Sequence, residues 1–445
     1  MKIQFTHYLW SIILIFSVIR GAFVYHLGLP ANITYSLSAL LLMGFGLLSF
    51  LLMVNRASDS GLMLFKSAVK INFFLFGFYS FGFILMNYLL GQNLEIGHLY
   101  LFIIFPIIFQ VIKFDQKLID GILFSVTFVT AFGIAYFYNL ALTGGYEEVI
   151  LAQEILRPGV YSIARIGENI SSFGYAGLHH DTANILVMCG IFFLSKFFLA
   201  NQGLGKLFYF TVYCLVFISA LLTVSAANIL VLILVSFLTL LIYFKQNIKV
   251  FFLYLIFFLL ISPFLVSFLI DISGQLELYA YIFSKFNPET VSENLFLGLD
   301  YESIKSSFFS LLFGFGRPLD APMIYGEIAF IALISVYGIL PFLVLVFIGF
   351  SPLYYIIKFR MNYALRVDII KRMNIEIPIS HYRKYSRYQI FRLSITAMPA
   401  LSGFLTLIHY GSIFRITSIG LFCVMLSFFY KEYLEANHNF ISGVD

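Results

Sequence analysis

The sequence predicts an all-α, polytopic integral membrane protein that forms one transmembrane domain over residues 1–445. Two features of composition support this fold class: 61% of the residues are hydrophobic and only 11% are charged, whereas about 25% of the residues of soluble domains are charged. In addition, apolar runs long enough to cross a bilayer as a helix, which takes roughly 20 residues, recur from one end of the chain to the other. The composition therefore excludes an ordinary soluble domain.

The apolar runs predict about twelve transmembrane helices. The first run begins near Tyr8 and no A-x-A-like cleavage site follows it, so we expect a retained span rather than a signal peptide. The tenth is too long for one straight crossing, and we expect Gly338 and Pro341 to divide it into a short re-entrant piece and a full span. The predicted spans are residues 8–27, 33–54, 69–90, 97–114, 118–140, 181–200, 207–223, 226–244, 248–270, 325–357, 393–410 and 413–430.

The distribution of positive charge predicts the orientation of these spans. Most of the 27 Lys and Arg residues fall in links that share one side of the membrane with the N-terminus, and such links are usually cytoplasmic. We therefore expect both termini in the cytoplasm, a basic cytoplasmic loop at 358–392 that contacts anionic lipid, and two long outer loops at 141–180 and 271–324. The polar tail from Glu432 is expected to be frayed.

The second outer loop contains a predicted amphipathic helix over residues 301–312, with Asp300 as a possible N-cap. The pattern ends before Gly314-Phe315-Gly316. Its apolar face is formed by Tyr301, Ile304, Phe308, Leu311 and Leu312, and its polar face by Glu302, Lys305 and Ser306.

The first outer loop carries the densest polar stretch of the chain, residues 157–181, which read RPGVYSIARIGENISSFGYAGLHHD. Arginine suits phosphate groups because its planar fork forms bidentate, charge-assisted hydrogen bonds. The glycines of the stretch either let the backbone approach a bulky headgroup or only shape a loop. The residues that we expect to bind a phosphate or glycan are Arg157, Arg165, Glu168, His179, Lys305 and Arg317.

A catalytic base is the second requirement of a site that performs chemistry. Glu327 and His180 are the main candidates, and His179 and Glu168 are alternatives, because a carboxylate or imidazole can remove a proton from a hydroxyl. Glu327 begins a largely apolar helix, where an ionisable residue indicates function unless it pairs with Arg317 or the helix dipole stabilises it. Asp181 belongs to the site or caps a helix.

Other classes of site have little support in the sequence. Cys189, Cys214 and Cys423 fall inside predicted spans and are expected to be small core residues. No metal spacing and no nucleotide-binding pattern is present, so we expect no metal, no cofactor and no nucleic-acid partner. Arg20, inside the first predicted span, is expected to snorkel outward or to act as a buried ion partner.

Three stretches, together with the layout of spans and loops, resemble the O-antigen polymerase and ligase superfamily of bacterial inner membranes. The first is LLFGFGRPLDAPMIYGEIAFIALISVYGILPF at 311–342. The second, LLTVSAANILVLIL at 221–234, has Ala226 where many members have Arg. The third is HHDTANILVMCG from His179, where many members carry Pro-Asn in place of His180-Asp181.

This resemblance implies a GT-C-like membrane fold and glycan transfer from undecaprenyl pyrophosphate on the periplasmic side, without a metal. It also implies a chain-length regulator as a possible partner. The ligase usually carries a His where this chain has Glu327, which favours the polymerase. In that reaction the arginines stabilise the departing pyrophosphate, and Glu327 or His180 takes the proton of the acceptor hydroxyl. The alternatives are the ligase and a non-enzymatic transporter of the same lipid-linked sugar.

Overall fold

The structure, a computed structural model, describes most of the predicted spans but only parts of the two predicted outer loops. Four of the candidate site residues, Glu168, Lys305, Arg317 and Glu327, lie outside the described residues. The residues described are 2–55, 77–85, 88, 104–158, 165–166, 169–170, 172–201, 203–223, 225–244, 252, 256, 308–313, 334, 338–372, 379–407 and 416–442.

Nearly all of these residues are helical, which confirms the predicted fold class for the described part of the chain. One short antiparallel pair, β1 (Arg165–Ile166) and β2 (Asn169–Ile170), aligns Arg165 with Ile170, and a 3₁₀ turn, η3, spans Gly174–Ala176. The helices are α1 (Lys2–Leu27), α2 (Ala31–Asn55), α4 (Ile104–Val111), α5 (Gln116–Leu156), α6 (His179–Leu199), α7 (Gly203–Leu222), α8 (Ala226–Phe244), α13 (Phe308–Phe313), α15 (Ile339–Arg372), α16 (Ile379–Leu407) and α17 (Ile416–Ser442).

Among the described residues, seven helices are long and apolar enough to cross a membrane. They coincide with predicted spans, as do α16 and α17, which are more polar. The total of about twelve stays a prediction, because much of the predicted spans at 69–90, 97–114 and 248–270 lies outside the described residues. The seven segments are Thr6–Leu27, Ala31–Leu52, Gln116–Leu156, His179–Leu199, Gly203–Leu222, Ala227–Phe244 and Ile339–Leu365.

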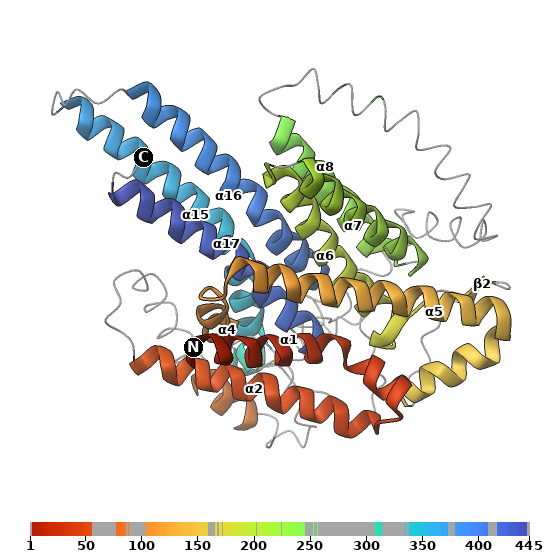
Figure 1. Cartoon of the computed structure of the whole chain (residues 1–445). Coiled ribbons are helices and arrows are strands. Elements are labelled where there is room, and N and C mark those ends of the chain that lie inside the picture. Colours follow the sequence, from red (N-terminus) through yellow and green to blue (C-terminus); the bar gives the residue numbers. More distant parts are fainter. Residues whose placement is uncertain are drawn as a thin grey trace.

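Helix α6 lies at the centre of the bundle. Figure 1 shows α7 and α8 beside it, with α15, α16 and α17 forming a second group and α5 crossing near both. Most of α6 is buried inside the protein. Ser195 Oγ donates a hydrogen bond of 3.1 Å to the Ile395 carbonyl of α16, and the rings of Phe192 and Phe428 meet edge to face, joining α6 to α17. The second half of α6 is therefore enclosed by α16 and α17.

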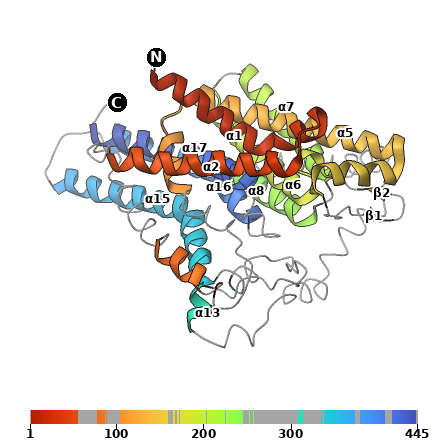
Figure 2. The ribbon, with the colours of Figure 1, turned by 90° about the horizontal axis from the view of Figure 1, so that it is seen from below.

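The two ends of the bundle differ in what they carry. The beginning of α1, the end of α17 and the tips of α15 and α16 lie at one end, and β1 and β2 lie at the other (Figures 1 and 2). This arrangement agrees with the prediction that both termini and the link at 358–392 share one side. Which side faces the cytoplasm stays a prediction.

The end of α5 differs from the sequence-based expectation. Residues 141–156, assigned to the first outer loop, are helical, and Gly145, with φ 76°, redirects the chain within α5. After that glycine the helix turns back (Figure 1). The reason is a short amphipathic pattern in which Val149, Ala152 and Leu156 recur at helical spacing and are buried, so this segment packs against the bundle instead of crossing it.

The predicted basic loop is also largely helical. Residues 358–372 continue α15, and residues 379–392 begin α16. Likewise the tail expected to fray continues α17 to Ser442, with Tyr433 and Ala436 buried. Charged residues such as Lys, Arg and Glu are good helix formers, so the end of an apolar stretch does not mark the end of a helix.

Two other expectations are confirmed in part; the re-entrant piece expected before Gly338 lies mostly outside the described residues, and Pro341 lies within α15. Gly338 has φ 84° and its N–H donates a 3.0 Å hydrogen bond to the Ile334 carbonyl. The chain therefore breaks there, and α15 begins at the next residue. Cys189 and Cys423 are fully buried and Cys214 is half-buried, all three as free thiols.

Candidate functional site

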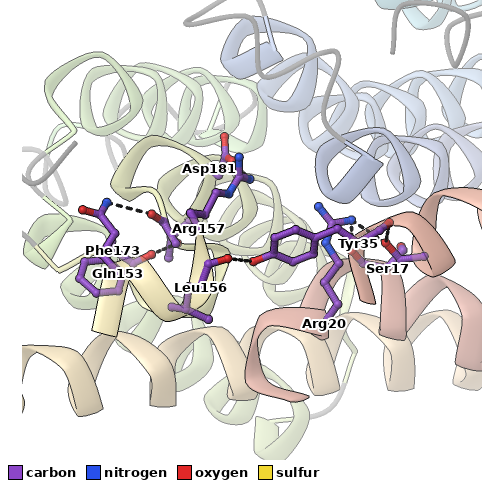
Figure 3. A network of polar contacts seen from close by, with 11 residues as sticks. Ser17, Arg20, Tyr35, Gln153, Leu156, Arg157, Phe173 and Asp181 are labelled. Carbon is purple, nitrogen blue, oxygen red and sulfur yellow. Dashed lines mark hydrogen bonds and ion pairs between the residues drawn. The ribbon is translucent and has the colours of Figure 1, made fainter. Parts of the chain in front are cut away.

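The first turn of α6 holds a buried carboxylate. Leu178 is the N-cap of α6 and Asp181 lies three residues further on, so Asp181 is not the cap. Instead Asp181 Oδ2 lies 3.2 Å from Nη2 of Arg157, and the Asp181 side chain is fully buried. Figure 3 shows this ion pair. A carboxylate in the first turn of a helix is also stabilised by the helix dipole.

Arg157 reaches α6 because the end of α5 is fixed against the turn that precedes α6. Arg157 is the C-cap of α5, and its backbone N–H donates to the Gln153 carbonyl at 2.7 Å. Gln153 Nε2 in turn donates to the Gly177 carbonyl at 3.1 Å. The predicted phosphate-binding residue Arg157 therefore contacts the first turn of α6, the turn whose backbone also carries His179 and His180.

Tyr35 of α2 links this region to α1. Its hydroxyl donates a hydrogen bond to the Leu156 carbonyl, and the Arg157 guanidinium carbon lies 5.8 Å from the centre of its ring. The guanidinium carbon of Arg20 lies 4.6 Å from the same ring, within the range of a cation–π interaction. Both arginines therefore share one aromatic neighbour.

Arg20 is buried rather than snorkelling. Its Nη1 donates to Ser38 Oγ at 2.9 Å and to the Ser17 carbonyl at 3.3 Å, and only 7% of the residue is exposed. We call the connected set the Arg157 network (Figure 3), which comprises Ser17, Arg20, Tyr35, Ser38, Gln153, Leu156, Arg157 and Asp181.

The described residues of the Arg157 network contain two guanidinium groups and one carboxylate. Arginine therefore predominates among the charged groups of the network that the structure describes. The Arg157 side chain keeps 20% of its surface exposed, whereas Asp181 and Arg20 are buried. Because charges act more strongly where water is excluded, this arrangement is suited to an anionic group that approaches from the side of Arg157.

His180 belongs to a second polar group, formed with Ser225 and Asn228 at the start of α8. Nδ1 of His180 lies 2.9 Å from Ser225 Oγ, and Asn228 Nδ2 donates to that same oxygen at 2.8 Å. His180 is half-buried, whereas Ser225 and Asn228 are fully buried. For Nε2 of His180 to act as a base, Nδ1 must carry the hydrogen and donate it to Ser225. The ring of His179, a buried residue, lies against that of His180, with 3.7 Å between ring centres.

The turn before α6 is held by close packing and hydrogen bonds. Thr182 Oγ1 donates to the Phe173 carbonyl, and the Tyr175 hydroxyl is hydrogen-bonded to His26 Nε2. Burial raises the pKa of Tyr175 to about 12, so its phenol stays protonated at neutral pH. A Cβ on Gly21 of α1 would lie 1.7 Å from the Tyr175 carbonyl oxygen, so only glycine permits this approach. These contacts hold the turn before α6, and with it the first turn of α6, against α1.

The structure thus brings together three of the predicted site residues, Arg157, His179 and His180. Arg165 lies in β1, and its side chain is not among those described. Within the described part of the chain, no group of three His, Cys, Asp or Glu residues is placed to hold a metal ion.

Sequence reasoning gave no role to several residues of the site. Ser225 and Asn228 stand out only as polar residues at the start of an apolar run, a signal that could have been used. Tyr35 carries no such signal, because aromatic residues are frequent throughout this chain. Its role depends on contacts with residues far away in the sequence.

Comparison with known proteins identifies no relative: no family model, no curated protein and no solved structure matches this chain.

Proposed function

We propose that this protein is a polysaccharide polymerase of a bacterial inner membrane. It would join undecaprenyl-pyrophosphate-linked oligosaccharide repeat units into O-antigen or a related surface polysaccharide, by metal-independent, inverting glycosyl transfer on the periplasmic side. The observation that supports it best is the Arg157 network, whose arginine Arg157 reaches Asp181 in the same first turn of α6 that carries His180, at the start of the most enclosed candidate span in the described part of the chain. Together with the sequence resemblance, this juxtaposition of an anion site and a base favours transfer from a pyrophosphate.

In this proposal the Arg157 network stabilises the leaving group. As the bond between the anomeric carbon and the pyrophosphate oxygen breaks, the electron pair stays with undecaprenyl pyrophosphate. Fixed guanidinium groups then stabilise the negative charge that develops there. Arg157 has the exposed surface needed to meet the lipid, and Arg165 and Arg317 stay proposed contributors.

The acceptor hydroxyl attacks the opposite face of the anomeric carbon, which inverts its configuration. Its proton passes to a base, for which His180 is supported by its half-buried position and by Ser225, which can accept the Nδ1 hydrogen. Nε2 then offers the lone pair that takes the proton. Glu327 stays the alternative base.

Two of the three described charges of the Arg157 network, those of Arg157 and Asp181, lie at the end of α5 and in the first turn of α6, whereas Arg20 lies in the last third of α1. Transporters of such lipids are expected to keep their charged residues near the midplane, so this location favours chemistry over transport. The ligase would use the same geometry and is distinguished by its product.

The test is the polysaccharide ladder of a deletion strain. A polymerase deletion leaves single repeats on the lipid core, and wild-type protein restores the ladder. Arg157→Gln and His180→Gln should not restore it at equal protein levels, whereas Arg360→Gln, at an exposed position of α15, should. Bare lipid core with accumulated lipid-linked polymer would instead identify a ligase. An unchanged ladder would exclude both enzymes for that polymer.

A further inference from the structure

Two buried asparagines near His180 carry side-chain atoms that the fold does not satisfy. Asn184 of α6 is fully buried, and within the described part of the chain neither its Oδ1 nor its Nδ2 has a hydrogen-bond partner. Asn228 of α8 is also fully buried, and although its Nδ2 is bonded, its Oδ1 lacks a partner among the described residues. Native proteins rarely leave such atoms without a partner.

Asn184 lies on the first turns of α6, and Asn228 of α8 contacts the same part of α6. Asn228 Nδ2 donates to the His180 carbonyl at 3.3 Å, and in an α-helix the backbone N–H of Asn184 donates to that same carbonyl. Asn184 also follows His180 by four residues and therefore lies on the same helix face. Both amides are thus within one helical turn of the candidate base.

An unsatisfied buried amide destabilises a fold because it has lost its bonds to water. A leucine at position 184 has a similar branched shape, although it is larger, and carries no polar atom that needs a partner. The polar atoms therefore have an evident use only when another group supplies the missing hydrogen bonds. A buried water molecule would also satisfy them, and the experiment below separates that case.

The unpartnered atoms of Asn184 and Asn228 determine which chemical group can bind there. They comprise the oxygens Asn184 Oδ1 and Asn228 Oδ1, which accept, and Asn184 Nδ2, which donates. An anion would meet two carbonyl oxygens, and a cation would meet an amide donor. Hydroxyl groups both donate and accept without carrying charge, so the set is complementary to a hydroxylated sugar ring.

We infer that Asn184 and Asn228 form a subsite that binds hydroxyl groups of the acceptor sugar and turns its reacting hydroxyl toward His180. This inference rests on the proposed function. The half-buried side chain of His180 marks the side from which the sugar enters. Asn184 is then a binding residue, whereas Asn228 also supports Ser225.

The experiment uses the full-length protein in lipid nanodiscs and two probes. One is undecaprenyl pyrophosphate, and the other is the lipid-linked repeat unit extracted from the deletion strain. Affinity for each probe and the Tm without probe are measured for wild type and Asn184→Leu. Gln110→Leu is the matched control, because Gln110 of α4 is also buried with an unpartnered Nε2 among the described residues but lies in a different part of the bundle (Figure 1).

We expect wild type to bind the repeat unit more tightly than undecaprenyl pyrophosphate. Asn184→Leu should weaken binding of the repeat unit about tenfold, as expected for the loss of one or two hydrogen bonds, leave undecaprenyl pyrophosphate binding unchanged, and keep or raise the Tm. Gln110→Leu should keep or raise the Tm without changing either affinity.

Three results would overturn the subsite. They are equal wild-type affinity for the two probes, unchanged binding of the repeat unit by Asn184→Leu, and equal weakening of both probes by Asn184→Leu, which would show a general structural effect instead of lost sugar contacts. The proposed function itself fails in a different way: the deletion strain accumulates no lipid-linked repeat unit, or wild type binds neither probe.

Discussion

Arg157 and Asp181 are 24 residues apart in the sequence, and their side chains form an ion pair of 3.2 Å between the end of α5 and the first turn of α6. The pair is asymmetric, because Asp181 is fully buried whereas 20% of the Arg157 side chain is exposed. The carboxylate therefore depends on the arginine more than the arginine depends on the carboxylate. This relationship fixes the charged group that we place at the centre of the site.

Removing Arg157 should destabilise the protein because the buried Asp181 carboxylate loses the ion pair with this arginine. We expect Arg157→Ala to lower the free energy of unfolding by about 3 kcal/mol, measured by equilibrium unfolding in mixed micelles. Asp181→Asn should cost less, since it leaves a neutral amide, and should recover part of the loss when combined with Arg157→Ala. Strictly additive effects in this double-mutant cycle would contradict the coupling.

The hydroxyl and the ring of Tyr35 should each contribute separately to the free energy of unfolding. Tyr35→Phe removes the hydrogen bond to the Leu156 carbonyl and should cost about 1 kcal/mol, while both guanidinium contacts with the ring persist. Tyr35→Leu also removes those contacts and should cost about 1 kcal/mol more. Tyr8→Phe, at an exposed position of α1, is the control and should leave the unfolding free energy unchanged. Equal stability of Tyr35→Phe and wild type would argue against the hydrogen bond.

The turn within α5 should depend on glycine at position 145. Gly145 has φ 76° and ψ −168°, a region that only glycine occupies readily, and a side chain there costs about 1–3 kcal/mol. No atom lies within 4 Å of a Cβ added at this position, so any loss of stability in Gly145→Ala comes from the backbone. Gly121→Ala in the same helix also meets open space and should stabilise by about 1 kcal/mol. A stabilising effect at both sites would show that α5 does not turn at Gly145.

Glu432 should give the stability a pH dependence. Its carboxylate lies 2.7 Å from Arg392 Nη2, yet burial is the larger effect and raises the pKa of Glu432 above its ordinary value of 4.5, with Arg392 opposing the rise. The folded state therefore holds this proton more tightly than the unfolded state. The resulting stabilisation is fully present below pH 4.5 and is lost as the pH rises through the raised pKa of Glu432.

To test this, the free energy of unfolding is measured as a function of pH, starting at about pH 4, near the ordinary pKa of a carboxyl group. We expect Glu432→Gln to flatten the decrease with rising pH, and Glu147→Gln, at an exposed position, to leave it unchanged. If stability rises with pH across this window in wild type but not in Glu432→Gln, the ion pair with Arg392 outweighs burial.

The candidate site was only partly predictable. Arg157 and His180 could be selected because charged or titratable residues between two apolar runs are unusual in such a chain. The role of Asp181 could not be selected, since a helix cap and an ion pair are equally compatible with an acidic residue at the start of a span. The difference depends on where the end of α5 lies, which the local sequence does not encode.

The sequence by itself determined that this chain is an all-α membrane protein, because long apolar runs can satisfy their backbone hydrogen bonds in a bilayer as helices. It also determined the break at Gly338, since glycine readily adopts positive φ. Only the tertiary structure decided that Arg20, Tyr35, Arg157 and Asp181 belong to one network. Those contacts join α1, α2, α5 and α6, and such contacts form only when helices far apart in the sequence pack against one another.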